Sequence, residues 1–132
     1  MRAELTIEIV RTPEDVFDYL TDVSNLPAWQ SGVTSATMRD GRIVESRSLL
    51  GREFRTTLEV VDQEPPRLFT LRALDSPFPF TVRHELELRD GVTHLRVVAE
   101  GDVPGIAATL MARRAEKQFR KDFERLKRIL ES

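Results

Sequence analysis

The last segment of the chain restricts the fold more than any other part. Residues 106–132 contain no proline and no glycine, and their apolar side chains recur at spacings of three and four. Nothing else in the chain is long enough to cover an apolar sheet face, so we expect this segment to be one amphipathic helix lying across a sheet. Its expected buried stripe consists of Ala108, Ala112, Ala115, Phe119, Phe123, Leu126 and Leu130.

The two halves of this expected helix differ in the size of their buried side chains. The C-terminal half carries bulky residues, and the N-terminal half carries alanines at positions 107, 108, 112 and 115. Protein interiors are close-packed, so the space beside the alanines is either filled from the sheet or left open as a pocket. The residues that would fill it are Phe54, Phe69, Phe78 and Phe80.

Most of the remaining chain is typical of an antiparallel sheet. Near the start, Leu5, Ile7 and Ile9 alternate with polar residues, which indicates a strand with one buried face. Asp40-Gly41 and Asp90-Gly91 are dipeptides that favour tight hairpin turns. We expect seven strands, the last six forming a meander, at residues 3–10, 33–39, 43–50, 53–63, 67–74, 79–89 and 92–101.

Two short helical segments are expected between the first and second strands. Thr12 is a capping residue and Pro13 suits the first helical position, so a helix is predicted to begin there. Asp22 can cap a second short turn. Pro27 is expected to end that turn, because proline disfavours the helical conformation at the preceding Leu26.

Size and composition are those of one globular domain covering residues 1–132. Hydrophobic residues make up 40% and charged residues 32%, and no stretch reaches the ~18–20 apolar residues of a membrane helix. With 20 basic and 22 acidic residues the net charge is −2, so no overall charge draws the protein to nucleic acid. We expect no membrane span and no nucleic-acid partner, and the sequence does not indicate an oligomeric state.

Several classes of chemistry lack the residues they need. Cysteine is absent, and His84 and His94 are too few for a histidine metal cage. No glycine-rich phosphate loop, nucleophile elbow or HExxH motif is present, so we expect no metal and no cofactor. Glu4 and Glu8 interrupt any apolar leader near Met1, which makes a cytoplasmic location the expectation.

The chain resembles a known family, the polyketide cyclase/dehydrase group of the START-like (SRPBCC) superfamily. The similarity covers essentially the whole chain, and its short motifs are mostly structural. They are Thr12-Pro13-Glu14-Asp15-Val16-Phe17, Leu20-Thr21-Asp22, Leu26-Pro27-Ala28-Trp29, Glu59-Val60-Val61, Pro66-Arg67-Leu68, Gly91-Val92-Thr93-His94-Leu95 and Leu126-Lys127-Arg128-Ile129-Leu130-Glu131.

The resemblance implies an α+β helix-grip fold. In that fold a curved, seven-stranded antiparallel sheet wraps around a long C-terminal helix, and two short helices follow the first strand. It also implies a small hydrophobic or amphipathic ligand, such as a lipid, sterol, polyketide or quinone, held between helix and sheet. The family transfers no fixed catalytic set onto this chain.

His84 is the leading candidate for a polar group inside such a cavity. It is the one ionisable side chain in the apolar alternation Phe80, Val82, His84, Leu86 and Leu88. An imidazole there either orients a ligand or is a core histidine satisfied by a neighbour. The full set of cavity candidates is Trp29, Phe54, Phe69, Phe78, Phe80, His84, Leu110, Met111, Arg114 and Gln118.

Three functions are compatible with these residues. The first is a carrier or sensor that binds a small hydrophobic ligand without covalent chemistry. The second is a polyketide cyclase or dehydratase using acid–base groups in the same cavity, for instance His84 with Arg114. The third is an interaction module that uses the basic helix face around Arg113, Lys117 and Arg120. Whether the protein is an enzyme is left open.

Overall fold

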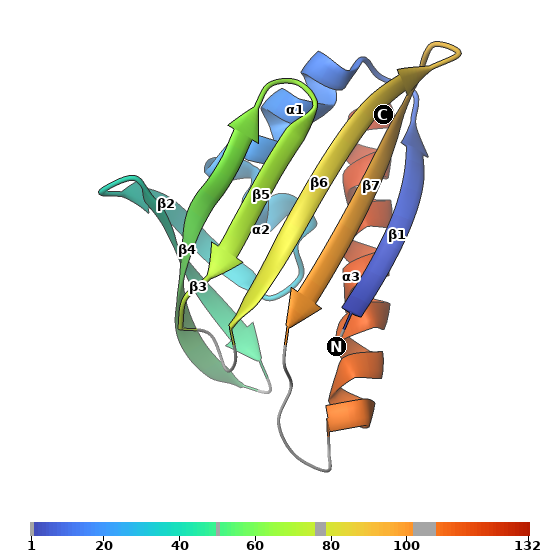
Figure 1. The fold of residues 1–132 in the computed structure, drawn as a ribbon. Helices are drawn as coiled ribbons and strands as arrows, with labels where there is room; N and C mark the ends of the chain where they lie inside the picture. The colour runs from blue at the N-terminus through green and yellow to red at the C-terminus, as the bar shows by residue number, and fades with distance from the viewer. Residues whose placement is uncertain (1, 50, 76–78, 102–107) are drawn as a thin grey trace.

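A computed structural model of the chain describes residues 2–49, 51–75, 79–101 and 108–132. Its seven strands form one antiparallel sheet in the order β1-β7-β6-β5-β4-β3-β2, which confirms the predicted meander (Figure 1). The elements are β1 (Arg2–Ile9), α1 (Pro13–Thr21), η1 (Val23–Asn25), α2 (Leu26–Trp29), β2 (Val33–Arg39), β3 (Arg42–Leu49), β4 (Arg52–Glu64), β5 (Leu68–Ala73), β6 (Phe80–Arg89), β7 (Val92–Gly101) and α3 (Ala108–Glu131).

The two hairpin dipeptides adopt the backbone conformation that their sequence predicts. Asp40 and Gly41 have φ angles of 52° and 75°, and Asp90 and Gly91 have φ angles of 51° and 78°. Positive φ at both central residues is the requirement of a type I′ turn, which connects adjacent antiparallel strands with the correct twist. These turns help to set the register of β2 on β3 and of β6 on β7.

The prediction that Pro27 ends a helical turn is wrong. Leu26 is helical, with φ −53° and ψ −44°, and Pro27 lies in the first turn of α2. Proline is tolerated there because an N–H in the first turn has no intrahelical partner to lose. The expected cap by Asp22 is present, since its carboxylate accepts a hydrogen bond from the Ser24 backbone N–H at 3.0 Å.

The start of α1 gives a first test of the local interactions. Thr12 Oγ1 accepts a hydrogen bond from the Asp15 backbone N–H at 3.1 Å. We expect Thr12→Ala to lower the free energy of unfolding by about 1 kcal/mol, because this amide loses its capping acceptor. Thr12→Ser keeps the hydroxyl and should stay close to the native protein in urea unfolding. An equal loss in both variants would contradict the capping role.

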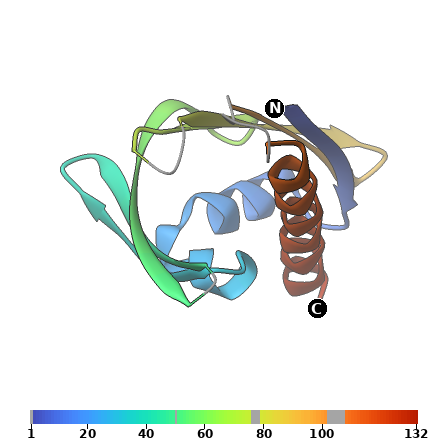
Figure 2. The same ribbon diagram turned by 90° about the horizontal axis from the view of Figure 1, so that it is seen from below.

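All the helices lie on the inner, concave side of the curved sheet (Figure 2). The apolar core forms there, between α1, α2, the C-terminal half of α3 and the sheet. Its fully covered side chains include Ile9, Trp29, Leu95 and Leu126, each no more than 1% exposed. The core therefore occupies the end of the grip where α3 finishes and β6 turns into β7.

Candidate functional site

On the inner face of the sheet, side chains become more exposed from His84 toward the start of β6. His84 of β6 pairs with Phe69 of β5 and Val97 of β7, and these side chains are 3%, 3% and 0% exposed. Two residues earlier on β6, Val82 pairs with Leu71, and both are only half-buried. On β6 the fully buried inner-face residues thus end at His84, whereas on β5 the core continues to Ala73, which is 1% exposed.

Helix α3 shows the same change along its length. Phe123, Leu126 and Leu130 are buried, whereas Phe119, one turn earlier, is half-buried. Ala115 is exposed, although helical geometry places it within about 20° of Leu126 around the axis. Ala112 is half-buried and the side chain of Ala108 lies outside the described part of the structure, so the reduced burial of the stripe is seen at Phe119 and above all at Ala115.

His84 is held as a neutral side chain inside the core. Its Nδ1 lies 2.8 Å from the Phe69 carbonyl oxygen, and its ring packs 5.6 Å from the Phe69 ring and 5.9 Å from the Phe123 ring. Burial lowers the pKa of His84 to about 4. At neutral pH Nδ1–H therefore donates to the carbonyl and Nε2 is an acceptor. This is the geometry of a satisfied core histidine.

Trp29 closes the core from the side of α2. The side chain is 1% exposed, and its ring centroid lies 5.0 Å from that of Phe123. Within the part of the chain that the structure describes, its buried Nε1 has no hydrogen-bond partner. A buried N–H without a partner costs free energy, so this donor is available to an acceptor that enters the interior.

A polar group on β3 was not among the candidates from sequence. Glu45 is 1% exposed, and its Oε1 accepts a hydrogen bond from Arg47 Nε at 2.9 Å. Arg47 Nη2 also donates to Gln30 Oε1 at 3.0 Å. The sequence signal for this group is strand alternation. Residues two apart on a strand point to the same face, so Glu45 and Arg47 share the inner face of β3 with the buried Ile43.

Asp122 connects α3 to the segment after α2. Its Oδ1 accepts hydrogen bonds from the Ser31 backbone N–H at 3.1 Å and from Gln118 Nε2 at 2.8 Å. Partial burial raises the pKa of Asp122, against the lowering effect of these hydrogen bonds. Gln118, a candidate from sequence, is therefore already engaged by a neighbouring side chain.

The candidate phenylalanines lie in different surroundings. Phe69 is part of the closed core, Phe80 is half-buried, and Phe54 is 41% exposed on the inner face beside Arg47. Phe78 lies outside the described residues. Phe54 is therefore not part of the closed core.

The remaining helix candidates are not brought together with His84. Leu110 is 57% exposed and Arg114 is also exposed. Arg114 lies nine residues before Phe123, the helix residue that touches His84, which is roughly 13 Å along the axis. The side chain of Met111 lies outside the described part of the structure. His84 and Arg114 thus do not form a joint acid–base site.

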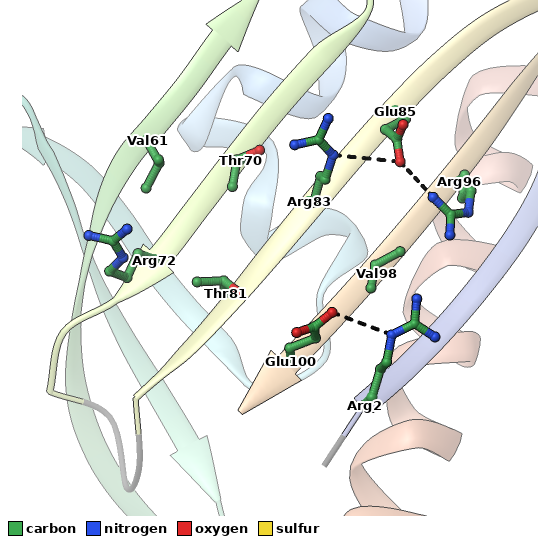
Figure 3. A pocket seen from close by; sticks show the side chains of 10 residues that line it. All are labelled: Arg2, Val61, Thr70, Arg72, Thr81, Arg83, Glu85, Arg96, Val98 and Glu100. Atoms are coloured by element: carbon green, nitrogen blue, oxygen red, sulfur yellow. Dashed lines mark hydrogen bonds and ion pairs between the residues drawn. The ribbon is translucent and has the colours of Figure 1, made fainter. Parts of the chain in front are cut away.

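The outer face of the sheet holds a shallow hollow of about 360 Å³, set among ion pairs (Figure 3). Arg96 lies 2.7 Å from a Glu4 carboxylate oxygen and 2.8 Å from one of Glu85. Arg2 and Glu100 form another pair at 3.3 Å. The lining of this hollow is therefore largely charged. A hydrophobic ligand needs a mainly apolar lining, so this hollow does not suit one.

Within residues 2–49, 51–75, 79–101 and 108–132, no group of three or more His, Cys, Asp or Glu side chains is placed to hold a metal ion. No helix within these ranges combines the length and hydropathy needed to cross a membrane.

A curved, seven-stranded antiparallel sheet that grips a C-terminal helix is the helix-grip fold, which places this chain in that class of proteins. More specifically, the sequence pattern of the family described as polyketide cyclase/dehydrase and lipid transport matches residues 1–131. The chain belongs to this family, as its sequence motifs predicted. A comparison with curated proteins gives no match.

Solved structures agree with this fold. A conserved protein from Geobacillus kaustophilus has a TM-score of 0.84 at 19% identity, covering 98% of this chain and 95% of its own. A START superfamily protein from Mycobacterium smegmatis has a TM-score of 0.77 at 15% identity, covering 98% of both chains. The di-domain ARO/CYC protein BexL from the BE-7585A biosynthetic pathway has a TM-score of 0.78 at 17% identity, covering 100% of this chain and 50% of its own. At these identities the likeness shows the fold alone.

Proposed function

We propose that this protein binds a small hydrophobic or amphipathic molecule between the N-terminal half of α3 and the inner face of the sheet, as a carrier or sensor. The observation that carries the proposal is the exposure of Ala115 on the same stripe of α3 whose C-terminal residues Phe123, Leu126 and Leu130 are buried. On the inner sheet face, Val82 and Leu71 are likewise only half-buried where they pack against the core. Apolar surface left uncovered in this way is what a hydrophobic ligand would cover.

Family membership supports the same role. Lipid transport and polyketide chemistry both appear in the description of the family, and both involve molecules with large apolar surfaces. BexL is an ARO/CYC protein of a biosynthetic pathway, so a cyclase of the same fold is the natural rival. The neutral, ring-packed His84 and the distant Arg114 favour binding over that acid–base chemistry.

The test uses N-phenyl-1-naphthylamine, an uncharged dye whose fluorescence rises in apolar surroundings. The native protein should bind it saturably, and Val82→Trp should weaken binding by about tenfold or more, because a bulky ring then occupies the inner face. Thr81→Trp is the matched control, since the next residue on a strand points to the opposite face.

Two results would count against the proposal. One is the absence of saturable dye binding by the native protein. The other is an equal loss in the Val82→Trp and Thr81→Trp variants while both retain native circular dichroism. Native mass spectrometry of the purified protein adds an independent measurement, because a retained ligand appears there as a defined mass increment.

A further inference from the structure

The Glu45–Arg47 pair lies on the inner face of β3, near the strand end that leads to β4. Across the inner face, Arg47 pairs with Phe54, which is 41% exposed, and Glu45 pairs with Thr56. The Arg47 side chain is 33% exposed and the Glu45 side chain 1%. The carboxylate is thus sealed inside the protein, while part of the guanidinium remains open beside an uncovered aromatic ring.

Arg47 has hydrogen-bond donors to spare. A guanidinium carries five N–H groups in a fixed plane. In the described residues Nε is used by Glu45 and one N–H of Nη2 by Gln30. Within that part of the chain, both N–H groups of Nη1 and the second one of Nη2 remain without a partner, and the two engaged N–H groups hold the guanidinium plane in place. The side chain is therefore a preorganised donor for an oxygen that arrives from the apolar face.

The charge of Arg47 is already balanced. Glu45 forms an ion pair with it inside the protein, and the carboxylate of Asp122 is close enough to interact with Arg47 electrostatically. A ligand carboxylate would add another negative charge in a region of restricted solvation, where an unbalanced charge is costly. A neutral oxygen accepts the same hydrogen bond without that cost.

From these observations, and resting on the proposed function, we infer that the ligand carries an uncharged oxygen atom. This oxygen accepts a hydrogen bond from the Arg47 guanidinium beside Phe54. The chemical class is an amphipathic molecule with an apolar body and a keto, ester or amide oxygen at one end. Glu45 is the positioning residue that excludes carboxylic acids by neutralising Arg47 in advance.

The experiment measures displacement of N-phenyl-1-naphthylamine by three naphthalenes of similar size. They are 2-ethylnaphthalene, the ketone 2-acetylnaphthalene and the acid 2-naphthoate at neutral pH. Each compound is titrated against the native protein, Glu45→Gln, and the double variant Glu45→Gln/Arg47→Met. The double variant leaves no unpaired buried charge, which keeps the comparison usable if Arg47→Met alone fails to fold.

In the native protein we expect 2-acetylnaphthalene to bind more tightly than 2-naphthoate. Glu45→Gln should raise the affinity for 2-naphthoate by about tenfold relative to the ketone, since the charge of Arg47 is then free. The double variant should lose about tenfold for the ketone relative to Glu45→Gln. Its affinity for 2-ethylnaphthalene should change by less than about twofold, because the hydrocarbon accepts no hydrogen bond.

The outcomes separate this inference from the proposed function. If none of the three compounds displaces the dye, or the dye does not bind, the proposed function fails and the inference fails with it. If the hydrocarbon binds but the two variants change all three affinities alike, the binding site stands and the role of Arg47 is overturned. Tighter native binding of 2-naphthoate than of the ketone overturns the role given to Glu45.

Discussion

Replacing Leu126 by alanine is expected to lower the free energy of unfolding by about 3 kcal/mol. Leu126 is 0% exposed and belongs to the core cluster under the C-terminal half of α3. The loss combines the transfer free energy of the removed methyl groups with the cavity that the rigid surroundings cannot fill. Urea unfolding followed by the fluorescence of Trp29 measures the change.

The same helix supplies the control. Leu110 is 57% exposed, so Leu110→Ala should change the free energy of unfolding by less than about 0.5 kcal/mol. Both substitutions remove the same atoms from the same secondary structure, and only the tertiary packing differs. A comparable loss in the two variants would mean that the N-terminal half of α3 is packed as tightly as its C-terminal half.

A second large effect is expected when the pH is lowered from 7 to 4.5. The pKa of His84 is about 4 in the folded protein, against an ordinary value of 6.5, because burial disfavours the charged ring. As the pH falls below 6.5, the unfolded chain takes up a proton that the folded protein cannot accept. Stability therefore falls through this window, and the gap between the two pKa values corresponds to about 3 kcal/mol by pH 4.

Other titratable groups change the stability in the opposite direction or in a different pH range. The pKa values of Glu4 and Glu131 are lowered, chiefly by hydrogen bonds from Arg96 and Lys127 respectively, so their contributions are lost only as the pH falls through the carboxylate range. The pKa of Asp122 is raised by burial, so its protonation favours the folded state as the pH falls. The interval from pH 6.5 to 4.5 is thus dominated by His84.

His84→Asn isolates the effect. The asparagine amide can still donate toward the Phe69 carbonyl but does not titrate, so the fall in stability between pH 6.5 and 4.5 should disappear. His94→Asn is the control, since that ring lies on the outer part of β7 with 22% of its side chain exposed. The midpoint of urea unfolding, measured at several pH values, tests this expectation. An unchanged pH dependence in His84→Asn would show that the loss of stability does not come from His84.

The sequence predicted the strands and the long helix well because their signals are local. Alternation along β6 placed His84 among apolar residues, and the Asp-Gly dipeptides located two hairpins. The failure at Pro27 has a local cause too, since a proline both disfavours the helical conformation before it and suits the first turn of a helix. Those two preferences conflict, and packing of the buried Leu26 and Trp29 resolves the choice in favour of helix.

The candidate site was less predictable. Arg114 lies close in sequence to the small-residue stripe and Leu110 is a further cavity candidate, but a helix turns about 100° per residue, and both side chains are exposed. Glu45 and Arg47 were overlooked because a charged pair on a strand usually indicates a solvated face. Nothing adjacent in the chain reveals that the curved sheet carries them toward Gln30 and α3.

By itself the sequence determined the order of elements, the hairpins and the asymmetry of the last helix, since each follows from side-chain periodicity and turn chemistry within a few residues. Only the tertiary structure decided that His84 is a neutral core residue and that Arg47 is held by Glu45 and Gln30. Those roles depend on burial and on contacts between strands and helices far apart in the chain. Local patterns carry no information about the curvature that brings such groups together.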